Sequence, residues 1–180
     1  KGRTVQTLLG LYPDASFLAA YEPNARLARK LAKRFVHDPR VSVRQAALGD
    51  VGGAASLRVP VRATCASLLS PLEGTCDTEG LVLQETPVVR LEDEMDEPPH
   101  ILKMDVQGFE LPVLRGTGRL LAGVTAVAAE VAFRPRYAGQ ALAWEVRDWL
   151  GARGFFLEGL YGPLYDADGR VVAADGLFLR

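Results

Sequence analysis

The sequence predicts a single α/β domain with a mainly parallel sheet, helices on both faces and an antiparallel hairpin at the C-terminal end. Short apolar runs alternate with amphipathic helical patterns, which is typical of parallel strands joined by crossover helices. The chain has 180 residues, of which 48% are hydrophobic and 24% charged, as in an ordinary globular domain with one core. We find no repeat, low-complexity segment or linker, so residues 1–180 are expected to form one domain.

The order of the predicted elements follows these patterns along the chain. They are a helix at 3–11, a strand at 15–23, a helix at 25–35, strands at 41–50, 55–61 and within 86–95, a strand at 101–106, a helix around Pro112, a strand at 124–133, a helix at 141–154, and two terminal strands joined across Asp168-Gly169. The Asp-Gly pair is a common hairpin turn.

Residue patterns within single segments support several of the predicted helices and strands. In 25–35, apolar residues recur at i, i+4 and i+8 while Arg and Lys fill the other face, and Asn24 is placed to cap the helix. Pro112 suits the first turn of a helix, and Gly154 suits the end of one. The nearly continuous apolar run at 124–133 indicates a strand that is buried on both faces.

Two segments lack a regular pattern. Residues 62–86 are rich in small and polar side chains, so we expect a long loop over a site there. The acidic segment 92–97 is followed by two prolines and predicts a solvated turn, not a metal site.

Charge and hydropathy exclude several functions. The net charge of −1 gives no reason to expect nucleic acid or an acidic membrane surface as a partner. No apolar run approaches the roughly 20 residues that cross a bilayer, and no signal peptide is visible. We therefore expect a cytoplasmic protein, whose oligomeric state the sequence leaves open.

The cysteines and histidines do not predict a metal site. Cys65 and Cys76 lie in no CxxC or His-paired spacing, so we interpret them as free thiols, with a local disulfide as the alternative. His37 and His100 are far apart in the sequence and are interpreted as surface or structural residues.

Four acids lie at or near the ends of predicted strands. Glu22, Asp50 and Asp105 each follow an apolar run, and Glu130 lies near the end of a fourth. Ligands of parallel sheets bind beyond the carboxyl ends of the strands. A carboxylate such as Glu22 can accept hydrogen bonds from both hydroxyls of a ribose, and Asp50 could accept one from an adenine amino group. The alternative is a set of internal salt bridges, for example from Lys103 to Glu130 or Asp105.

The stretch 101–116 combines strand, turn and helix signals with four polar side chains. We expect Lys103 to be tied to a nearby acid, Asp105 to point into the cleft and Gly108 to allow a sharp turn. Glu110 would lie in the first turn of a helix, where the dipole stabilises an acid by about 0.3–1 kcal/mol. That electrostatic role is an alternative to a role of Glu110 in catalysis.

Four motifs together resemble the FkbM-type methyltransferases, which use S-adenosylmethionine (SAM). They are YEPN at 21–24, AALGDVGG at 46–53, KMDVQGFELPVLRG at 103–116 and YDADGRVVAADGLFLR at 165–180. The third is similar to the most specific motif of the family, Lys-x-Asp-x-Glu-Gly-x-Glu followed by Leu-x-Gly. The resemblance covers essentially the whole chain and implies the Rossmann-like fold of class I SAM methyltransferases.

The chain departs from the family pattern at two places. Position 107 is Gln where Glu is common, so no catalytic role is assigned to it. The expected first strand and its Gly-rich turn do not appear, and Gly2 looks like the last glycine of that turn. We therefore expect further residues, including that strand, upstream of Lys1.

The resemblance implies methyl transfer from SAM to a hydroxyl of a small molecule, such as a natural product or a sugar. It places the cofactor against Gly2, Glu22, Pro23, Leu48, Gly49, Asp50 and Asp105. Asp105 is the first candidate for the methyl-transfer centre, either as a base or as a partner of the cationic cofactor, and Glu110 and Glu130 follow.

Two other functions remain open at this stage. A nucleotide-dependent oxidoreductase would use Glu22 to hold the ribose of NAD and would carry GxGxxG before Lys1. A non-catalytic module with this fold would not bind SAM even with its upstream residues present.

Overall fold

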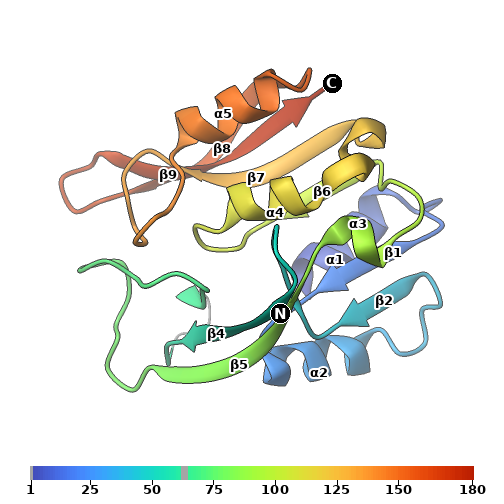
Figure 1. Ribbon diagram of the computed structural model, residues 1–180, viewed down its shortest axis with the longest axis horizontal. Coiled ribbons are helices and arrows are strands. Elements are labelled where there is room, and N and C mark those ends of the chain that lie inside the picture. Colours follow the sequence, from blue (N-terminus) through green and yellow to red (C-terminus); the bar gives the residue numbers. More distant parts are fainter. Residues whose placement is uncertain (1, 62–64) are drawn as a thin grey trace.

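The computed structural model describes residues 2–61 and 65–180, which form a mixed α/β fold (Figure 1). Its elements are α1 Arg3–Leu11, β1 Leu18–Tyr21, α2 Ala25–Arg34, β2 Val41–Arg44, β3 Ala47–Leu48, β4 Gly53–Val59, β5 Val82–Val89, α3 Leu91–Glu94, β6 Ile101–Met104, α4 Glu110–Gly116, the 3-10 helix η2 Gly118–Gly123, β7 Ala126–Ala132, α5 Ala143–Gly151, β8 Phe156–Tyr165 and β9 Val171–Leu179. The order of the longer helices and strands agrees with the sequence prediction, whereas the separate strand β3, the short helix α3 and η2 were not predicted.

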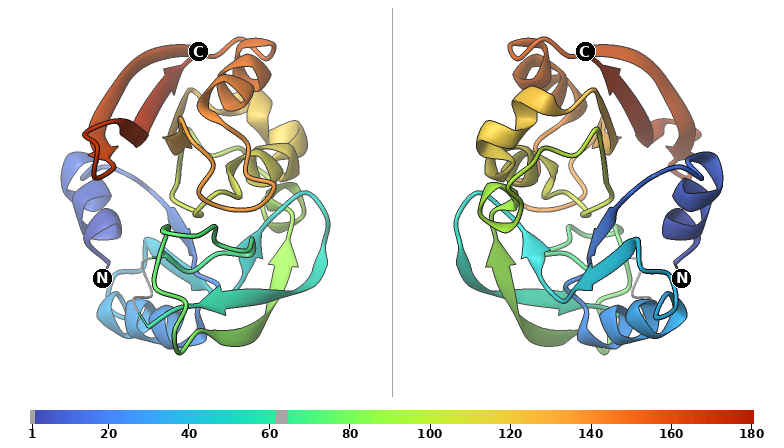
Figure 2. Two further views of the ribbon diagram at one scale, coloured as in Figure 1. Left: turned by 90° about the vertical axis from the view of Figure 1, so that its left-hand side faces the viewer. Right: turned by 90° about the vertical axis from the view of Figure 1, so that its right-hand side faces the viewer.

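The strands of the described residues form three sheets. Strands β1 and β2 are a parallel pair, β3–β5–β4 is a mixed sheet, and β6–β7–β9–β8 is a four-stranded sheet. The predicted terminal hairpin is confirmed, because β8 and β9 pair antiparallel. The antiparallel hairpin of β4 and β5 was not predicted, so the fold is less uniformly parallel than expected. The two hairpins lie at opposite ends of the molecule (Figure 2).

Helices α4 and α5 pack against the four-stranded sheet, and α2 packs against β2. The main apolar core lies between that sheet and its helices and includes Leu114, Val127, Leu150 and Phe178, all at most 1% exposed. Asn24 caps α2 as predicted, because its side chain accepts hydrogen bonds from the backbone N–H groups of Arg26 and Leu27.

Two predictions from the irregular segments were wrong in part. The expected loop 62–86 is shorter, because β5 already begins at Val82; residues 62–64 lie outside the described residues. The acidic segment 92–97 is not wholly a solvated turn. Glu94 ends α3 with a side chain only 10% exposed and pairs with Arg44 at 2.5 Å, which neutralises its charge.

Gly116 allows α4 to contact the turn after β3. A Cβ at this position would collide with the carbonyl oxygen of Gly49 and lie 3.2 Å from the backbone nitrogen of Asp50. Backbone atoms cannot swing aside as a side chain can, so only glycine permits this close approach. The contact fixes the position of the Gly49-Asp50 turn relative to α4.

We expect Gly116→Ala to lower the free energy of unfolding by about 1–3 kcal/mol, because the added methyl group forces the helix and the turn apart. Urea denaturation followed by circular dichroism measures this change. Gly10→Ala in α1 is the matched control: no atom lies within 4 Å of the added Cβ. It is expected to stabilise the helix by up to about 1 kcal/mol. Equal stability of Gly116→Ala and the wild type would contradict the packing argument.

Candidate active site

Two acids meet at the carboxyl ends of adjacent parallel strands. β6 and β7 pair in a register that sets Met104 opposite Ala129. Asp105 is the first residue after β6, and Glu130 follows Ala129 near the end of β7. Asp105 is exposed, and the Glu130 side chain is 18% exposed. The pairing of the strands therefore places two carboxylates side by side at the edge where ligands of such sheets bind.

Gln107 connects these two carboxylates. Its Nε2 donates hydrogen bonds to Asp105 Oδ1 at 2.7 Å and to Glu130 Oε2 at 3.3 Å. Its Oε1 accepts a hydrogen bond of 2.8 Å from the Tyr137 hydroxyl. Sequence reasoning assigned Gln107 no role and did not single out Tyr137, since a lone Tyr in an irregular segment carries no recognisable signal.

The electrostatic environment raises the pKa of Glu130. Burial is the largest cause, and the negative charge of Asp105 adds to it. Arg136, whose guanidinium lies 3.6 Å from Glu130, opposes the shift, as Lys103 does more weakly. A carboxylate with a raised pKa is a stronger proton acceptor than an exposed one.

Glu110 lies behind this pair, at the start of α4. Glu110 is only 2% exposed, and its Oε1 accepts a hydrogen bond from the Gly108 N–H at 3.2 Å. Burial raises the pKa of Glu110 to about 7. The sharp turn expected at Gly108 is present, with φ of 97°. The raised pKa goes against the expected stabilisation of an ionised Glu110 by the helix dipole, because burial outweighs it; the hydrogen bond instead gives the carboxyl group a role in holding the turn.

The partner of Lys103 is not the one expected. Its Nζ lies 2.7 Å from Asp175 Oδ1, on β9, and not against Glu130 or Asp105. β9 pairs with β7 so that Asp175 is opposite Glu130. The expectation that Lys103 is tied to an acid is confirmed, but Asp175 was not foreseen because it is 72 residues away and becomes a neighbour only through the strand order of the sheet.

The Glu22-Pro23-Asn24 corner follows β1. Glu22 Oε1 accepts a hydrogen bond from the Asn24 N–H at 2.9 Å. The carbonyl oxygen of Pro23 accepts hydrogen bonds from Gln84 and Thr86 of β5, which hold the corner in place. The YEPN motif therefore forms a rigid turn at the carboxyl end of a parallel strand.

The turn after β3 contains the other predicted cofactor residues. Leu48 packs on the main core, and a Cβ at Gly49 would lie 2.8 Å from Val88 and 3.2 Å from Phe109. Asp50 follows with a side chain 35% exposed, 3.9 Å from Arg115. The backbone at Gly49 thus has no room for a side chain, while the Asp50 carboxylate reaches solvent.

Gly2 lies immediately before α1 in the left-handed region, with φ of 81°. A Cβ there would be 3.0 Å from Leu31 and 3.3 Å from Phe35, so glycine also allows close packing on α2. Its predicted contact with the cofactor stays a prediction.

The segment 65–76, part of the expected loop, is hydrogen-bonded to the backbone of Gln107 and Arg136. The Ser67 hydroxyl donates to the carbonyl oxygen of Gln107 at 2.7 Å. Leu72 N–H and the Thr75 hydroxyl both donate to the carbonyl oxygen of Arg136, at 2.8 and 2.6 Å. Cys65 and Cys76, near the two ends of this segment, are free thiols.

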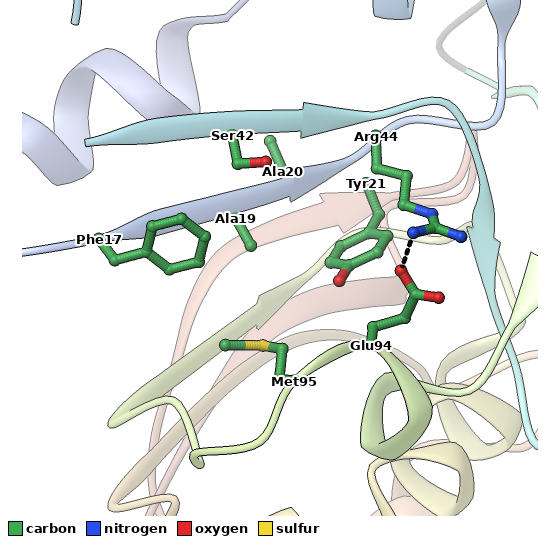
Figure 3. Close-up of a pocket in the computed structure, with 8 residues that line it drawn as sticks. All are labelled: Phe17, Ala19, Ala20, Tyr21, Ser42, Arg44, Glu94 and Met95. Carbon is green, nitrogen blue, oxygen red and sulfur yellow. Dashed lines mark ion pairs between the residues drawn. The ribbon is translucent and has the colours of Figure 1, made fainter. Parts of the chain in front are cut away.

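A small pocket of about 140 Å³ lies away from the carboxylates, beside β1 and β2 (Figure 3). Phe17, Tyr21 and Met95 contribute to its lining, and the Arg44–Glu94 ion pair lies at one end. The pocket is much smaller than the usual 300–1,000 Å³ of a ligand site. We therefore place the candidate site at the strand ends and not in this pocket.

Within residues 2–61 and 65–180, no group of three or more His, Cys, Asp or Glu side chains is arranged to hold a metal ion. None of the helices described here has the length and apolar character that a membrane span requires.

The comparisons with known proteins agree with this arrangement. Residues 15–157 match the FkbM methyltransferase domain. The crystal structure of methyltransferase FkbM from Methylobacillus flagellatus KT at 2.20 Å resolution has a TM-score of 0.60 and 17% sequence identity, covering 99% of this chain and 40% of that chain. The chain thus spans well under half the length of that protein, and the likeness at this identity concerns the fold. No curated protein sequence matches the chain.

The structure is an α/β fold with acids at or near the ends of several strands, and the family match identifies its class. The chain belongs to the FkbM methyltransferase family, since the family domain matches most of its length. This confirms the family that the four sequence motifs predict, and it favours a methyltransferase over the oxidoreductase alternative.

Proposed function

We propose that the protein is a SAM-dependent methyltransferase that methylates a hydroxyl oxygen of a small molecule, such as a natural product or a sugar. The observation that carries the proposal is the pair of carboxylates, Asp105 and Glu130, bridged by one amide at the carboxyl ends of β6 and β7. A negative pair at this edge suits a cationic cofactor and an acceptor that must lose a proton.

The residues present fit the adenosyl part of SAM. Asp50 offers a partly exposed carboxylate that could accept a hydrogen bond from the adenine amino group, and the Gly49 backbone beside it packs closely against Val88 and Phe109, which fixes the turn. The residues proposed to hold the cofactor are Gly2, Glu22, Pro23, Leu48, Gly49, Asp50 and Asp105. When bound, SAM supplies a methyl group that its sulfonium has already activated.

Glu130 is the better candidate for the general base. Burial raises the pKa of its carboxyl group, and the Arg136 guanidinium, 3.6 Å away, partly opposes this shift. Glu130 would accept the proton of the acceptor hydroxyl while the oxygen takes the methyl group. Asp105 is more exposed and would act mainly through its negative charge toward the cofactor. The sequence prediction ranked Asp105 first, and the burial of Glu130 reverses that order.

The proposal includes the strand expected upstream of Lys1. In the part of the chain that the structure describes, β1 pairs only with β2 and β6 pairs only with β7, so each has one free edge. A two-stranded pair such as β1–β2 is marginally stable by itself. A parallel strand paired with both free edges would join the two sheets and complete the class I methyltransferase sheet. The experiments below therefore use the protein with its upstream residues.

The proposed setting is cytoplasmic, with a soluble small molecule as the partner of the enzyme. Calorimetric titration with SAM tests cofactor binding. Incubation with SAM and a panel of sugars and polyhydroxylated natural products, read by mass spectrometry, tests for the addition of one methyl group. Absence of SAM binding would identify a non-catalytic module, and binding of NAD in its place would identify an oxidoreductase.

We expect Asp105→Asn to weaken SAM binding by about 10- to 100-fold, because a charge-assisted interaction is replaced by a neutral one. Titration calorimetry measures this dissociation constant. Asp93→Asn, an exposed acid of α3, is the control and is expected to bind SAM as the wild type does. Unchanged SAM affinity together with lost turnover would show instead that Asp105 is the base.

A further inference from the structure

Two buried, uncharged side chains connect the candidate site to the loop around Arg136. Gln107 is 9% exposed and Tyr137 is 1% exposed. The Tyr137 hydroxyl donates to Gln107 Oε1 at 2.8 Å, and burial raises the pKa of this phenol, so it remains a protonated donor at neutral pH. Nothing else in the proposed reaction uses either side chain.

Hydrogen bonds at both ends of the Gln107 amide set which way it faces. Its Nε2 donates to carboxylate oxygens of Asp105 at 2.7 Å and Glu130 at 3.3 Å, and its Oε1 accepts from the Tyr137 phenol, which helps to hold that orientation. An NH₂ group has two hydrogens, and each serves one carboxylate. Donation favours the ionised form of Glu130 and bridges two carboxylates that would otherwise repel each other.

We propose that Tyr137 and Gln107 are positioning residues: the phenol helps to hold the amide in its orientation, and the amide holds Asp105 and Glu130 together, ready for substrate. This inference rests on the proposed function for its catalytic consequence, but not for its structural content. In this role the neutral amide of Gln107 binds two carboxylates at once.

The backbone around Gln107 supports a dedicated role. Gln107 has φ of 52° and is the one non-glycine residue of the described chain in the left-handed region. Ser67 donates to its carbonyl oxygen, and Gly108 follows with φ of 97° and would have Tyr137 3.1 Å from an added Cβ. Unfavourable backbone conformations persist where surrounding contacts determine them and are concentrated at functional sites.

The titration midpoint of the Glu130 carboxyl group reports the orientation of the Gln107 amide, because this carboxyl group is surrounded by other charges. The charged groups that act on its carboxylate or on its neighbour Glu110 come from β6, α4, β9 and the segment after β7: Lys103, Asp105, Glu110, Asp175 and Arg136. Around Glu130, three other acids face two cations, so replacing a hydrogen-bond donor by an acceptor beside Glu130 raises its affinity for protons.

The test is a titration of the Glu130 carboxyl by ¹³C NMR in the protein without cofactor or substrate, with the signal assigned from Glu130→Gln. In Tyr137→Phe the amide loses the bond that orients it and can turn its oxygen toward the acids, so the midpoint of Glu130 is expected to rise. In Gln107→Glu a third carboxylate replaces the donor, and the midpoint is expected to rise further.

Two control variants distinguish a specific effect on the Glu130 midpoint from a nonspecific effect of the same kind of substitution. Tyr165→Phe removes a hydroxyl from an exposed tyrosine of β8. Gln6→Glu makes the same amide-to-carboxylate change as Gln107→Glu at an exposed position of α1. Both are expected to leave the Glu130 midpoint nearly unchanged. Thermal melting identifies any variant that does not fold, and Tyr137→Phe decides the question if Gln107→Glu is unfolded.

Kinetics provide the second readout. One lost hydrogen bond corresponds to about a fivefold loss of kcat in Tyr137→Phe, with the acid limb of the pH profile shifted upward and KM little changed. A Glu130 midpoint that does not move in either variant would overturn the proposal, whatever the kinetics show. If the Glu130 midpoint moves but the protein binds no SAM, the positioning role of Tyr137 and Gln107 stands and the proposed function is wrong.

Discussion

Glu130→Gln is expected to reduce kcat for methyl transfer by roughly 10²- to 10⁴-fold, the usual contribution of a general base. The amide cannot take the proton that the acceptor hydroxyl must lose as its oxygen is methylated. SAM affinity should stay within a few-fold of the wild type, because Glu130 lies on β7 behind the exposed Asp105 and is already paired with Arg136. Single-turnover rates and calorimetry measure the two quantities separately.

The control for this substitution is Glu158→Gln, which makes the same change at an exposed position of β8. It is expected to leave both kcat and SAM affinity unaltered. The pH profile adds a check on the sign: because the pKa of Glu130 is raised, the wild-type rate should fall as pH drops through that raised value and its carboxylate is protonated. A Glu130→Gln enzyme that retains wild-type turnover would require another base or none.

Local patterns were sufficient for most of the fold. The α2 helix, with its Asn24 cap, and the β8–β9 hairpin were predictable because their signals are contained within a few residues. The β4–β5 hairpin was missed because β5 includes Gln84, Glu85 and Thr86 among its apolar residues, so its first half reads as loop. Its pairing with β4, over seven register positions, overrides that weak local preference.

The candidate site was predictable only where residues follow a strand directly. Asp105 and Glu130 come from adjacent parallel strands, so their placement at a shared edge follows from the fold class. Asp175 and Tyr137 could not be found in this way. They reach Lys103 and Gln107 across 72 and 30 residues of sequence, through strand order and a loop whose path depends on tertiary packing.

Glu110→Gln is expected to change how stability depends on pH. Burial raises the pKa of Glu110 to about 7 in the folded protein, from a reference value of 4.5. The folded state therefore binds more protons than the unfolded state between these values, and the free energy of unfolding falls as pH rises from about 4.5 to about 7. The full cost of ionising the buried acid, about 3 kcal/mol, is present above pH 7 and absent below the unfolded pKa.

Glutamine removes this ionisation while its carbonyl oxygen can still accept the hydrogen bond from the Gly108 N–H. Relative to the wild type, the variant should thus gain about 3 kcal/mol of stability between pH 4 and pH 8, whatever constant offset the new NH₂ group adds. Urea denaturation across this pH range measures the difference. Glu158→Gln should give a flat difference, since that acid is exposed. Parallel stability curves for Glu110→Gln and the wild type would mean that Glu110 ionises in the folded protein as easily as in the unfolded chain, and that its burial against the Gly108 turn has no electrostatic cost.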